Sequence, residues 1–429
     1  MKKALFTLVI AIVLIISLVV HSFCFGTGDI IAEIKDVYND VFNDGITETK
    51  VFPELKFDYS FYETAIDESE YYNYNQLNKV QQGMYKTILD AVIIMKTGNI
   101  NLGMVSKKDA IISMYAVKYD YPELFWLGFE YGTGEKDDTV YLRFDKGDLE
   151  GYTYTHDERV QMMQELQTAV KSIIGECITA DMTDFEKEVA IHDWLCQNVA
   201  YDTDADVFAD NIEERKRENP LPWTAYGAIV NRVAVCEGYS KAFQLLMYSV
   251  GINSNLVCGE VTDGSPHMWN TVLLDNEWYY VDVLWDDVDD DNVIHTFLNV
   301  DEEMISKTHT AYSNMSSVKD DSTIYSGEYN LKLPTADSNK MNYYVVNETA
   351  INSDNEFFDV VVDNMIMSAN DGSDSIEFYY SYKEMNENVV SYDIRDNKIF
   401  SAVKGKISDF KGFKYITYSY GTFILMISR

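Results

Sequence analysis

Residues 234–251 read AVCEGYSKAFQLLMYSVG, and this stretch predicts a helix that begins near Cys236 and ends at Gly251. Its leucine, methionine and valine side chains recur at the spacing of one helix face, and glycine commonly ends a helix. Cys236 therefore lies at or just before a helix N-terminus. Unpaired backbone N–H groups and the positive end of the helix dipole favour negative charge on sulfur there, so we expect a reactive thiol.

A strand and a hairpin follow the predicted helix. Residues 254–261 predict the strand, and the alternating apolar residues of 267–274 and 277–284 predict the two strands of the hairpin. Asp275 and Asn276 form the two-residue turn between them. The length of this turn decides which residues of the two strands face each other.

The register of the hairpin brings two polar side chains together. With a two-residue turn, Asp282 lies opposite Trp269, and His267 lies two residues farther along on the same face. His267 is then within diagonal reach of Asp282. A turn one residue longer or shorter would move the two side chains to opposite faces.

Cysteine, histidine and aspartate thus occur in that order, each on a predicted helix or strand. Cys236 would act as the nucleophile, His267 as the base, and Asp282 would fix the tautomer and orientation of the imidazole. The alternative is a buried structural cysteine, a turn histidine and a surface aspartate. Cysteine and histidine alone do not decide between these two interpretations.

Four short segments resemble the motifs of a known family. Residues 224–228 (TAYGA) and 235–240 (VCEGYS) are similar to the nucleophile segment of the transglutaminase-like superfamily, and residues 267–270 (HMWN) and 280–287 (YVDVLWDD) to its histidine and aspartate strands. The resemblance spans roughly residues 183–309. It implies an α+β, papain-like core in which the nucleophile helix packs on an antiparallel sheet. The superfamily includes cross-linking acyltransferases, peptidases and members without activity.

The composition excludes several classes of protein. Of 429 residues, 70 are acidic and 34 are basic, and the formal charge of −36 repels nucleic acid and anionic membranes. With 32 tyrosines and 21 phenylalanines the chain can build sizeable cores and is no disordered acidic tail. The five cysteines imply no disulfide framework, although a single chance pair stays open. No Cys or His spacing indicates zinc, so we expect no metal and no other cofactor.

The first 26 residues predict export. Two lysines precede an apolar run at residues 4–20, which is typical of a signal peptide and also short enough to be an uncleaved anchor. Acylation at Cys24 is a third, less favoured interpretation, because the residues before it lack the lipoprotein pattern. All three interpretations place the protein outside the membrane, secreted or at the cell surface, with the N-terminal segment as its one membrane contact.

The rest of the chain divides by composition. We expect an N-terminal α+β region, a catalytic domain, a Ser/Asp/Asn-rich linker and a small C-terminal α+β accessory domain, at residues 27–150, 151–312, 313–338 and 339–429. Residues 120–127 resemble a segment upstream of the catalytic core in secreted Gram-positive members of the superfamily. The aromatics of this segment either line a substrate groove or, as we favour, pack in a core.

Three aromatic residues are further candidates near the site. Acyl chemistry needs a hydrogen-bond donor for the oxyanion, and the backbone N–H of Cys236 is the first choice. Tyr226 is the first candidate for a side-chain donor and Trp223 the second, and Trp269 is a candidate for the substrate cleft. The alternative is that these rings only pack beside the nucleophile helix.

Two other polar segments have plainer interpretations. His192 lies on a predicted helix without partners that would complete a second site, so we interpret it as a packing residue. The acidic run at residues 286–292 lacks the glycine and distal glutamate of a calcium loop, so we expect a solvated turn.

Together these features predict an extracellular cysteine acyl-transfer enzyme that acts on protein or peptide amides through a thioester. The substrate is a glutamine side chain or a peptide bond, and the acceptor is water or a lysine-bearing protein such as one at the cell surface. Hydrolysis and cross-linking need the same triad, so both remain open. The alternative from another class is an extracellular binding protein that keeps this fold without catalysis.

Overall fold

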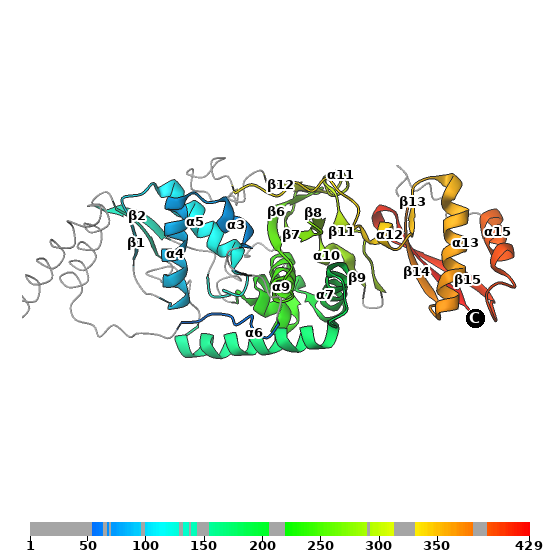
Figure 1. Ribbon diagram of the computed structural model, residues 1–429, viewed down its shortest axis with the longest axis horizontal. Helices are drawn as coiled ribbons and strands as arrows, with labels where there is room; N and C mark the ends of the chain where they lie inside the picture. Colours follow the sequence, from blue (N-terminus) through cyan, green and yellow to red (C-terminus); the bar gives the residue numbers. More distant parts are fainter. Residues whose placement is uncertain are drawn as a thin grey trace, which may run out of the picture.

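The computed structural model describes residues 54–62, 67, 70–95, 99–127, 132–136, 139–143, 154–205, 219–289, 292–312, 331–380 and 393–429. The apolar run at residues 4–20, on which the signal or anchor prediction rests, lies outside these residues. None of the helices within them combines the length and the apolar character that a membrane span needs. Figure 1 shows three regions in chain order along the long axis of the molecule.

The N-terminal region has three helices and a small sheet. The helices are α3 (Tyr72–Gln76), α4 (Lys79–Ile93) and α5 (Lys107–Asp120), and the sheet has the order β1 (Ile100–Gly103), β3 (Thr139–Arg143), β2 (Gly132–Lys136). Helices α4 and α5 pack against that sheet. Ser106 caps α5 by accepting a hydrogen bond from the Asp109 N–H. The aromatic segment that follows α5 is buried, so its rings belong to a core and do not line a groove.

Two long helices connect this region to the centre of the molecule. They are α6 (His156–Cys177), which Figure 1 shows running along one side of both regions, and α7 (Asp184–Asn198). Each begins with a capping box, in which Thr155 pairs with Glu158 and Thr183 with Glu186. One continuous hydrophobic core runs from Leu55 through α6 and α7 into the central sheet. The N-terminal region is therefore packed as part of the central body.

The central sheet is antiparallel and five-stranded, in the order β11–β8–β7–β6–β12. Its strands are β6 (Ser254–Val261), β7 (Pro266–Leu274), β8 (Glu277–Val281), β11 (Leu298–Val300) and β12 (His309–Ala311). Helix α9 (Cys236–Ser249) packs against β6 and β7. Short strands and helices surround them: β4 (Ala200–Tyr201), β5 (Val233–Ala234), α10 (Val283–Asp286), β9 (Asp287–Asp289), β10 (Asn292–Val293) and α11 (Glu302–Ile305). The same part of the chain has a π-helical turn at Gly227–Asn231 and 3-10 turns at Thr203–Ala205 and Leu221–Trp223.

The predicted hairpin register is the one in the structure. Leu274 pairs with Glu277 and Asn270 with Val281, and both turn residues have positive φ (Asp275 48°, Asn276 62°), as a tight hairpin turn requires. The second strand is shorter than predicted and ends at Val281. The reason is that the Asp282 side chain accepts a hydrogen bond from the Trp285 N–H and so caps α10.

The acidic run after the hairpin is only partly solvated. Asp286 is fully buried and accepts hydrogen bonds from the Phe297 N–H, and short strands β9 and β10 pair beyond it. The prediction of a solvated turn was therefore wrong for Asp286, because the backbone after β10 folds back over its carboxylate.

The C-terminal domain has its own hydrophobic core. Its sheet has the order β13 (Ala350–Ile351), β14 (Ser375–Tyr380), β16 (Thr422–Ser428), β15 (Gly412–Thr417), and it carries α13 (Asp354–Asp371) and α15 (Asp393–Val403), with α12 (Tyr343–Val346) before it. A 3-10 turn at Ser419–Gly421 joins β15 and β16. In Figure 1 this domain lies at the end of the molecule opposite the N-terminal region.

Candidate active site

Cys236 is the first residue of α9, as the sequence predicts. The residue before it, Val235, has no side chain able to cap the helix, so the N-cap leaves the positive end of α9 open to another acceptor. The Cys236 residue is buried, with 9% of its surface exposed. The sulfur therefore lies at the positive end of a helix in a nearly closed environment.

Hydrogen bonds fix the start of α9 against β7. The Ser240 hydroxyl lies 2.9 Å from both the Cys236 and the Met268 carbonyl oxygens. The Asn270 side chain donates to the Ser240 carbonyl over 3.0 Å. All these groups are buried or nearly so, and buried polar groups with satisfied partners give an element a defined position. The helix bearing the thiol and the strand bearing His267 are thus held together.

A glycine lets the preceding loop close over the same helix end. A Cβ atom at Gly238 would lie 2.4 Å from the Pro222 carbonyl oxygen, which is shorter than any ordinary contact. Only glycine fits this close approach of two backbones. Lys241 of the helix also holds this loop in place, because its ammonium donates to the Trp223 carbonyl over 3.2 Å. The same ammonium pairs with Glu237 over 2.7 Å.

His267 lies between the thiol and the carboxylate. Its Nε2 lies 2.6 Å from Asp282 Oδ2, and its side chain also hydrogen-bonds the Cys236 thiol. Burial disfavours the charged imidazole, but the Asp282 charge and the hydrogen bonds with Asp282 and Cys236 outweigh it and raise the pKa of His267 to about 10. Burial acts to raise the pKa of Asp282, yet the two histidines that face it hold that pKa well below its usual value.

A second histidine, which sequence reasoning missed, bonds the same carboxylate oxygen. His309 Nε2 lies 2.9 Å from Asp282 Oδ2, and its Nδ1 lies 2.7 Å from the Thr308 hydroxyl. His309 is buried and comes from β12, which pairs with β6. The Asp282 carboxylate therefore accepts from two imidazoles and from the Trp285 N–H, so it is held rigidly.

Aromatic side chains from two domains lie beside His267 and His309. The Trp285 ring lies 4.5 Å from the His309 ring and 6.0 Å from the His267 ring, measured between centroids. Tyr420, from the C-terminal domain, stacks on Trp285 at 5.6 Å and is 47% exposed. The C-terminal domain thus reaches the edge of the candidate site.

The three aromatic candidates do not have the positions that an oxyanion donor or a cleft-lining residue needs. Tyr226 donates its one hydroxyl proton to Glu165 over 2.6 Å, so this geometry does not support a donor role toward an oxyanion. Trp223 is buried in an apolar cluster with Ala205 and Val235. Trp269 is 1% exposed and packs against the His267 and His309 rings, so it does not line an open cleft. In each case packing beside the nucleophile helix is the better description.

The other thiols in the described residues have less reactive surroundings. Cys177, Cys196 and Cys258 are free, as is Cys236. Burial raises the pKa of the Cys177 and Cys196 thiols to about 11 and that of Cys258 to about 12. Cys196 also lies 4.0 Å from an imidazole, that of His192, but its sulfur donates to the Val283 carbonyl near the C-terminal end of α7. Cys236 instead lies at a helix N-terminus beside His267, which is bonded to a carboxylate, as a nucleophile and its base require.

Comparison with known proteins identifies the domain that holds this site. Residues 171–283 match the model of the transglutaminase-like superfamily. The human kyphoscoliosis peptidase is 23% identical over 156 residues, which are 34% of this chain and 22% of that protein. The mouse kyphoscoliosis peptidase is 22% identical over 157 residues, with the same coverage. The chain thus spans about a fifth of the length of these relatives.

A solved structure described as the crystal structure of a TGase covers 36% of this chain and 43% of its own, with 15% identity and a TM-score of 0.24. The family assignment rests on the sequence match. The chain therefore carries a transglutaminase-like superfamily domain, and the predicted fold, a nucleophile helix packed on an antiparallel sheet within an α+β chain, is confirmed.

Proposed function

We propose that this transglutaminase-like domain is a cysteine acyl-transfer enzyme, with Cys236 as nucleophile, His267 as general base and acid, and Asp282 as the residue that orients the imidazole. One observation carries the proposal. His267 hydrogen-bonds the Cys236 thiol and at the same time lies 2.6 Å from the Asp282 carboxylate through Nε2. A nucleophile, a base and an orienting acid in series are the arrangement that acyl transfer requires.

The first half of the reaction breaks the amide. The thiol proton passes to His267, and the sulfur attacks the carbonyl carbon, forming a C–S bond and placing the negative charge on the carbonyl oxygen. When the oxygen re-forms its double bond, the C–N bond breaks, and His267 returns its proton to the leaving nitrogen. Ammonia leaves from a glutamine side chain, or an amine from a peptide bond, and a thioester remains on Cys236.

The second half restores the thiol. Water or a primary amine attacks the thioester while His267 takes its proton, and the C–S bond breaks. His267 then gives that proton back to the sulfur. The product is a carboxylic acid with water as the acceptor, or a new amide with a lysine amine. The same residues serve both outcomes, and access of water to the thioester decides between them.

The oxyanion needs a donor in both halves. The backbone N–H of Cys236 is our candidate, because it belongs to the first turn of α9 and Val235 supplies no side-chain cap to compete with a substrate. The dipole of the fourteen-residue helix adds to the attraction for negative charge at that end.

We place the substrate among protein or peptide amides, because the site is built to attack a carbonyl and the formal charge of −36 disfavours nucleic acid. An acidic surface also attracts lysine-bearing acceptors, including proteins at a cell surface. Export as a secreted or anchored protein is part of the same proposal and rests on the N-terminal sequence alone. N-terminal sequencing of the mature protein separates cleavage from anchoring, and a full-length cytoplasmic chain would contradict export.

The proposed activity is tested by incubating the full chain with a casein-type substrate and a fluorescent primary amine, followed by mass spectrometry. If the enzyme cross-links, the amine should be attached to glutamine side chains. The mass of each modified peptide should then equal the peptide plus the amine minus one ammonia. Hydrolysis predicts deamidated glutamine or cleaved peptide bonds in the same samples. If none of these products exceeds the level of a sample pretreated with iodoacetamide, the enzyme proposal is wrong for this class of substrate.

A further inference from the structure

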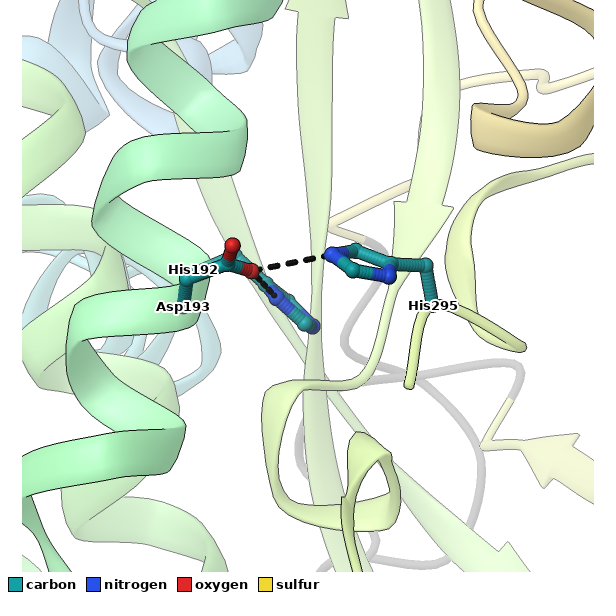
Figure 2. Close-up of side chains that lie close together, drawn as sticks. All are labelled: His192, Asp193 and His295. Atoms are coloured by element: carbon teal, nitrogen blue, oxygen red, sulfur yellow. Dashed lines mark hydrogen bonds and ion pairs between the residues drawn. The ribbon is translucent and has the colours of Figure 1, made fainter. Parts of the chain in front are cut away.

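A second group of histidines and carboxylates lies between α7 and the segment before β11. His192 and Asp193 come from α7, and His295 comes from the opposite side, so that both rings approach the Asp193 carboxylate (Figure 2). Asp193 Oδ1 lies 3.0 Å from His192 Nδ1 and 2.9 Å from His295 Nε2. Both imidazoles are buried, whereas about a third of the Asp193 side chain is exposed.

The outer nitrogen of each ring faces another carboxylate. His192 Nε2 lies 3.3 Å from Asp286 Oδ2, and His295 Nδ1 lies 2.6 Å from Glu377 Oε2. Asp286 is fully buried, and the Glu377 side chain is 9% exposed. We call these five residues, His192, Asp193, Asp286, His295 and Glu377, the carboxylate cluster. In it, each imidazole stands between two acidic groups.

The protons on two neutral imidazoles are too few to satisfy these contacts. A neutral imidazole carries one N–H and can donate to only one of its two carboxylates. When all three carboxylates are ionised, both His192 and His295 have to be cations to satisfy the four contacts, although their ring centroids lie only 5.2 Å apart in a buried place. Two like charges that are close and buried repel each other strongly.

We propose that the carboxylate cluster binds one zinc ion through His192 Nδ1, His295 Nε2 and a carboxylate oxygen of Asp193. The ion would take the place of the two inner protons. Both imidazoles are then neutral, and each donates its one N–H outward, to Asp286 or Glu377. A histidine ligand whose other nitrogen donates to a carboxylate is the usual arrangement at metal sites, because the carboxylate fixes the tautomer and strengthens the ligand.

The geometry and charge of the cluster fit this ion. The three ligand atoms already lie within 4.8 Å of one another. Tetrahedral zinc with bonds of about 2.0–2.2 Å separates its ligand atoms by roughly 3.3 Å, so the 2.9–3.0 Å contacts need only a small expansion. Three carboxylates outweigh a dication, which leaves no excess positive charge to bury. Two imidazole nitrogens favour zinc over calcium or magnesium, which prefer oxygen ligands.

The site also joins two domains. His295 and Asp193 belong to the transglutaminase-like domain and its surroundings, whereas Glu377 lies on β14 of the C-terminal domain. The Glu377 carboxylate also accepts hydrogen bonds from the backbone N–H of His295 and from the Tyr344 hydroxyl. Zinc on His295 would orient the ring toward Glu377 and so fix the C-terminal domain, which brings Tyr420 to the edge of the candidate active site. The proposal does not depend on the proposed acyl-transfer activity.

The test measures metal bound by the full chain. Protein purified in zinc-containing buffer and passed through a desalting column is analysed for metal, and we expect about one zinc per chain. Cobalt(II) added to metal-free protein should give the intense visible bands of a four-coordinate site, with the two imidazole nitrogens, the Asp193 oxygen and a water as fourth ligand. The same measurements are made on His295→Gln and Asp193→Asn, with His156→Gln on α6 as the matched control.

We expect zinc and the cobalt bands to be lost in both ligand variants and kept in the control. Glu377→Gln retains all three ligands but removes an outer carboxylate, so zinc affinity measured by competition with a chelator should fall about 10–100-fold. The proposal is overturned if wild-type protein holds no zinc and gives no four-coordinate cobalt spectrum, a result that does not depend on any variant folding. It is also overturned if folded His295→Gln binds zinc as tightly as the wild type.

Discussion

Two groups in this molecule share one motif, in which two imidazoles bond the same carboxylate oxygen. In what we call the thiol cluster, Cys236, His267, Asp282 and His309, the oxygen is Asp282 Oδ2. In the carboxylate cluster it is Asp193 Oδ1. The two clusters differ in the groups that contact the other nitrogen of each imidazole, which we call the outer nitrogen. The outer partners are a thiol and the Thr308 hydroxyl in the first cluster. In the second they are two carboxylates, and the Cys196 sulfur also lies 4.0 Å from His192 Nε2.

This difference in outer partners separates the two chemistries. In the thiol cluster, Asp282 is the one carboxylate that hydrogen-bonds either ring among the described residues. A dication there would meet one carboxylate, against three in the carboxylate cluster. A neutral thiol next to an imidazole can instead transfer its proton. In the carboxylate cluster three negative charges surround the rings, which suits a metal ion, and burial raises the pKa of the adjacent Cys196 thiol to about 11.

The largest effect expected is the loss of activity in Cys236→Ala. No thioester can form without the sulfur, so acyl transfer should fall to background, while the fold is retained because alanine fills most of the same space. The matched control is Cys177→Ala, which should keep wild-type activity. Product formation by Cys236→Ala at more than background would remove the thiol from the mechanism. Both are measured by amine incorporation and substrate hydrolysis.

The next effect concerns the two shared carboxylates. Asp282→Asn should lower kcat by about 10²–10⁴, because the amide cannot hold the imidazole in the tautomer that accepts the thiol proton. Asp193→Asn should leave kcat largely unchanged and instead abolish zinc binding. Circular dichroism checks that both variants are folded. If the two variants lowered kcat equally, the separation of roles between the clusters would be wrong.

A smaller effect is expected from His309→Gln. His309 positions Asp282 by a charge-assisted hydrogen bond, and loss of about 1.5 kcal/mol corresponds to a roughly tenfold lower kcat. The pH profile distinguishes this role from a merely structural one. Without the His309 contact, the Asp282 charge acts more strongly on His267 and raises its pKa. The alkaline limb of kcat/KM should therefore move to higher pH, and an unchanged limb would show that His309 does not act through Asp282.

The last effect is on stability, and it follows from the raised pKa of His267, about 10 against an ordinary 6.5. A group whose pKa is raised by folding stabilises the native state below its unfolded pKa, and this contribution is lost as the pH rises through the folded pKa. The difference in unfolding free energy between wild type and His267→Gln should therefore shrink between about pH 6.5 and pH 10. Denaturant titrations across this range measure it, and a constant difference would mean that His267 is not charged in the native protein.

The parts of the fold that follow from local chemistry are predictable from the sequence. Ser106 and Thr183 mark their helix starts because each side chain satisfies a backbone N–H within one turn. The hairpin register follows from Asp275 and Asn276, which tolerate the positive φ of a two-residue turn. The end of β8 at Val281 was missed, because the alternating pattern continues while Asp282 caps a new helix.

The parts of the site that depend on distant pairing are not predictable in this way. Cys236, His267 and Asp282 lie on adjacent elements, so their proximity can be inferred from one helix and one hairpin. His309 reaches Asp282 only because β12 pairs with β6 across the sheet. Asp193 and His295 are 102 positions apart, and no ligand spacing indicates that they meet. Tyr226 has the right neighbourhood in sequence, but its hydroxyl bonds Glu165 on α6.

The most direct test of the difference between the clusters is the rate at which each cysteine reacts with iodoacetamide near pH 6, read by peptide mapping. His267 and the start of α9 should make Cys236 react far faster than Cys177, Cys196 or Cys258, whose pKa values are raised by burial. Asp282→Asn should slow labelling of Cys236 and leave that of Cys177 unchanged. If Cys236 reacts no faster than Cys177 in the folded wild-type chain, the thiol cluster does not activate a nucleophile.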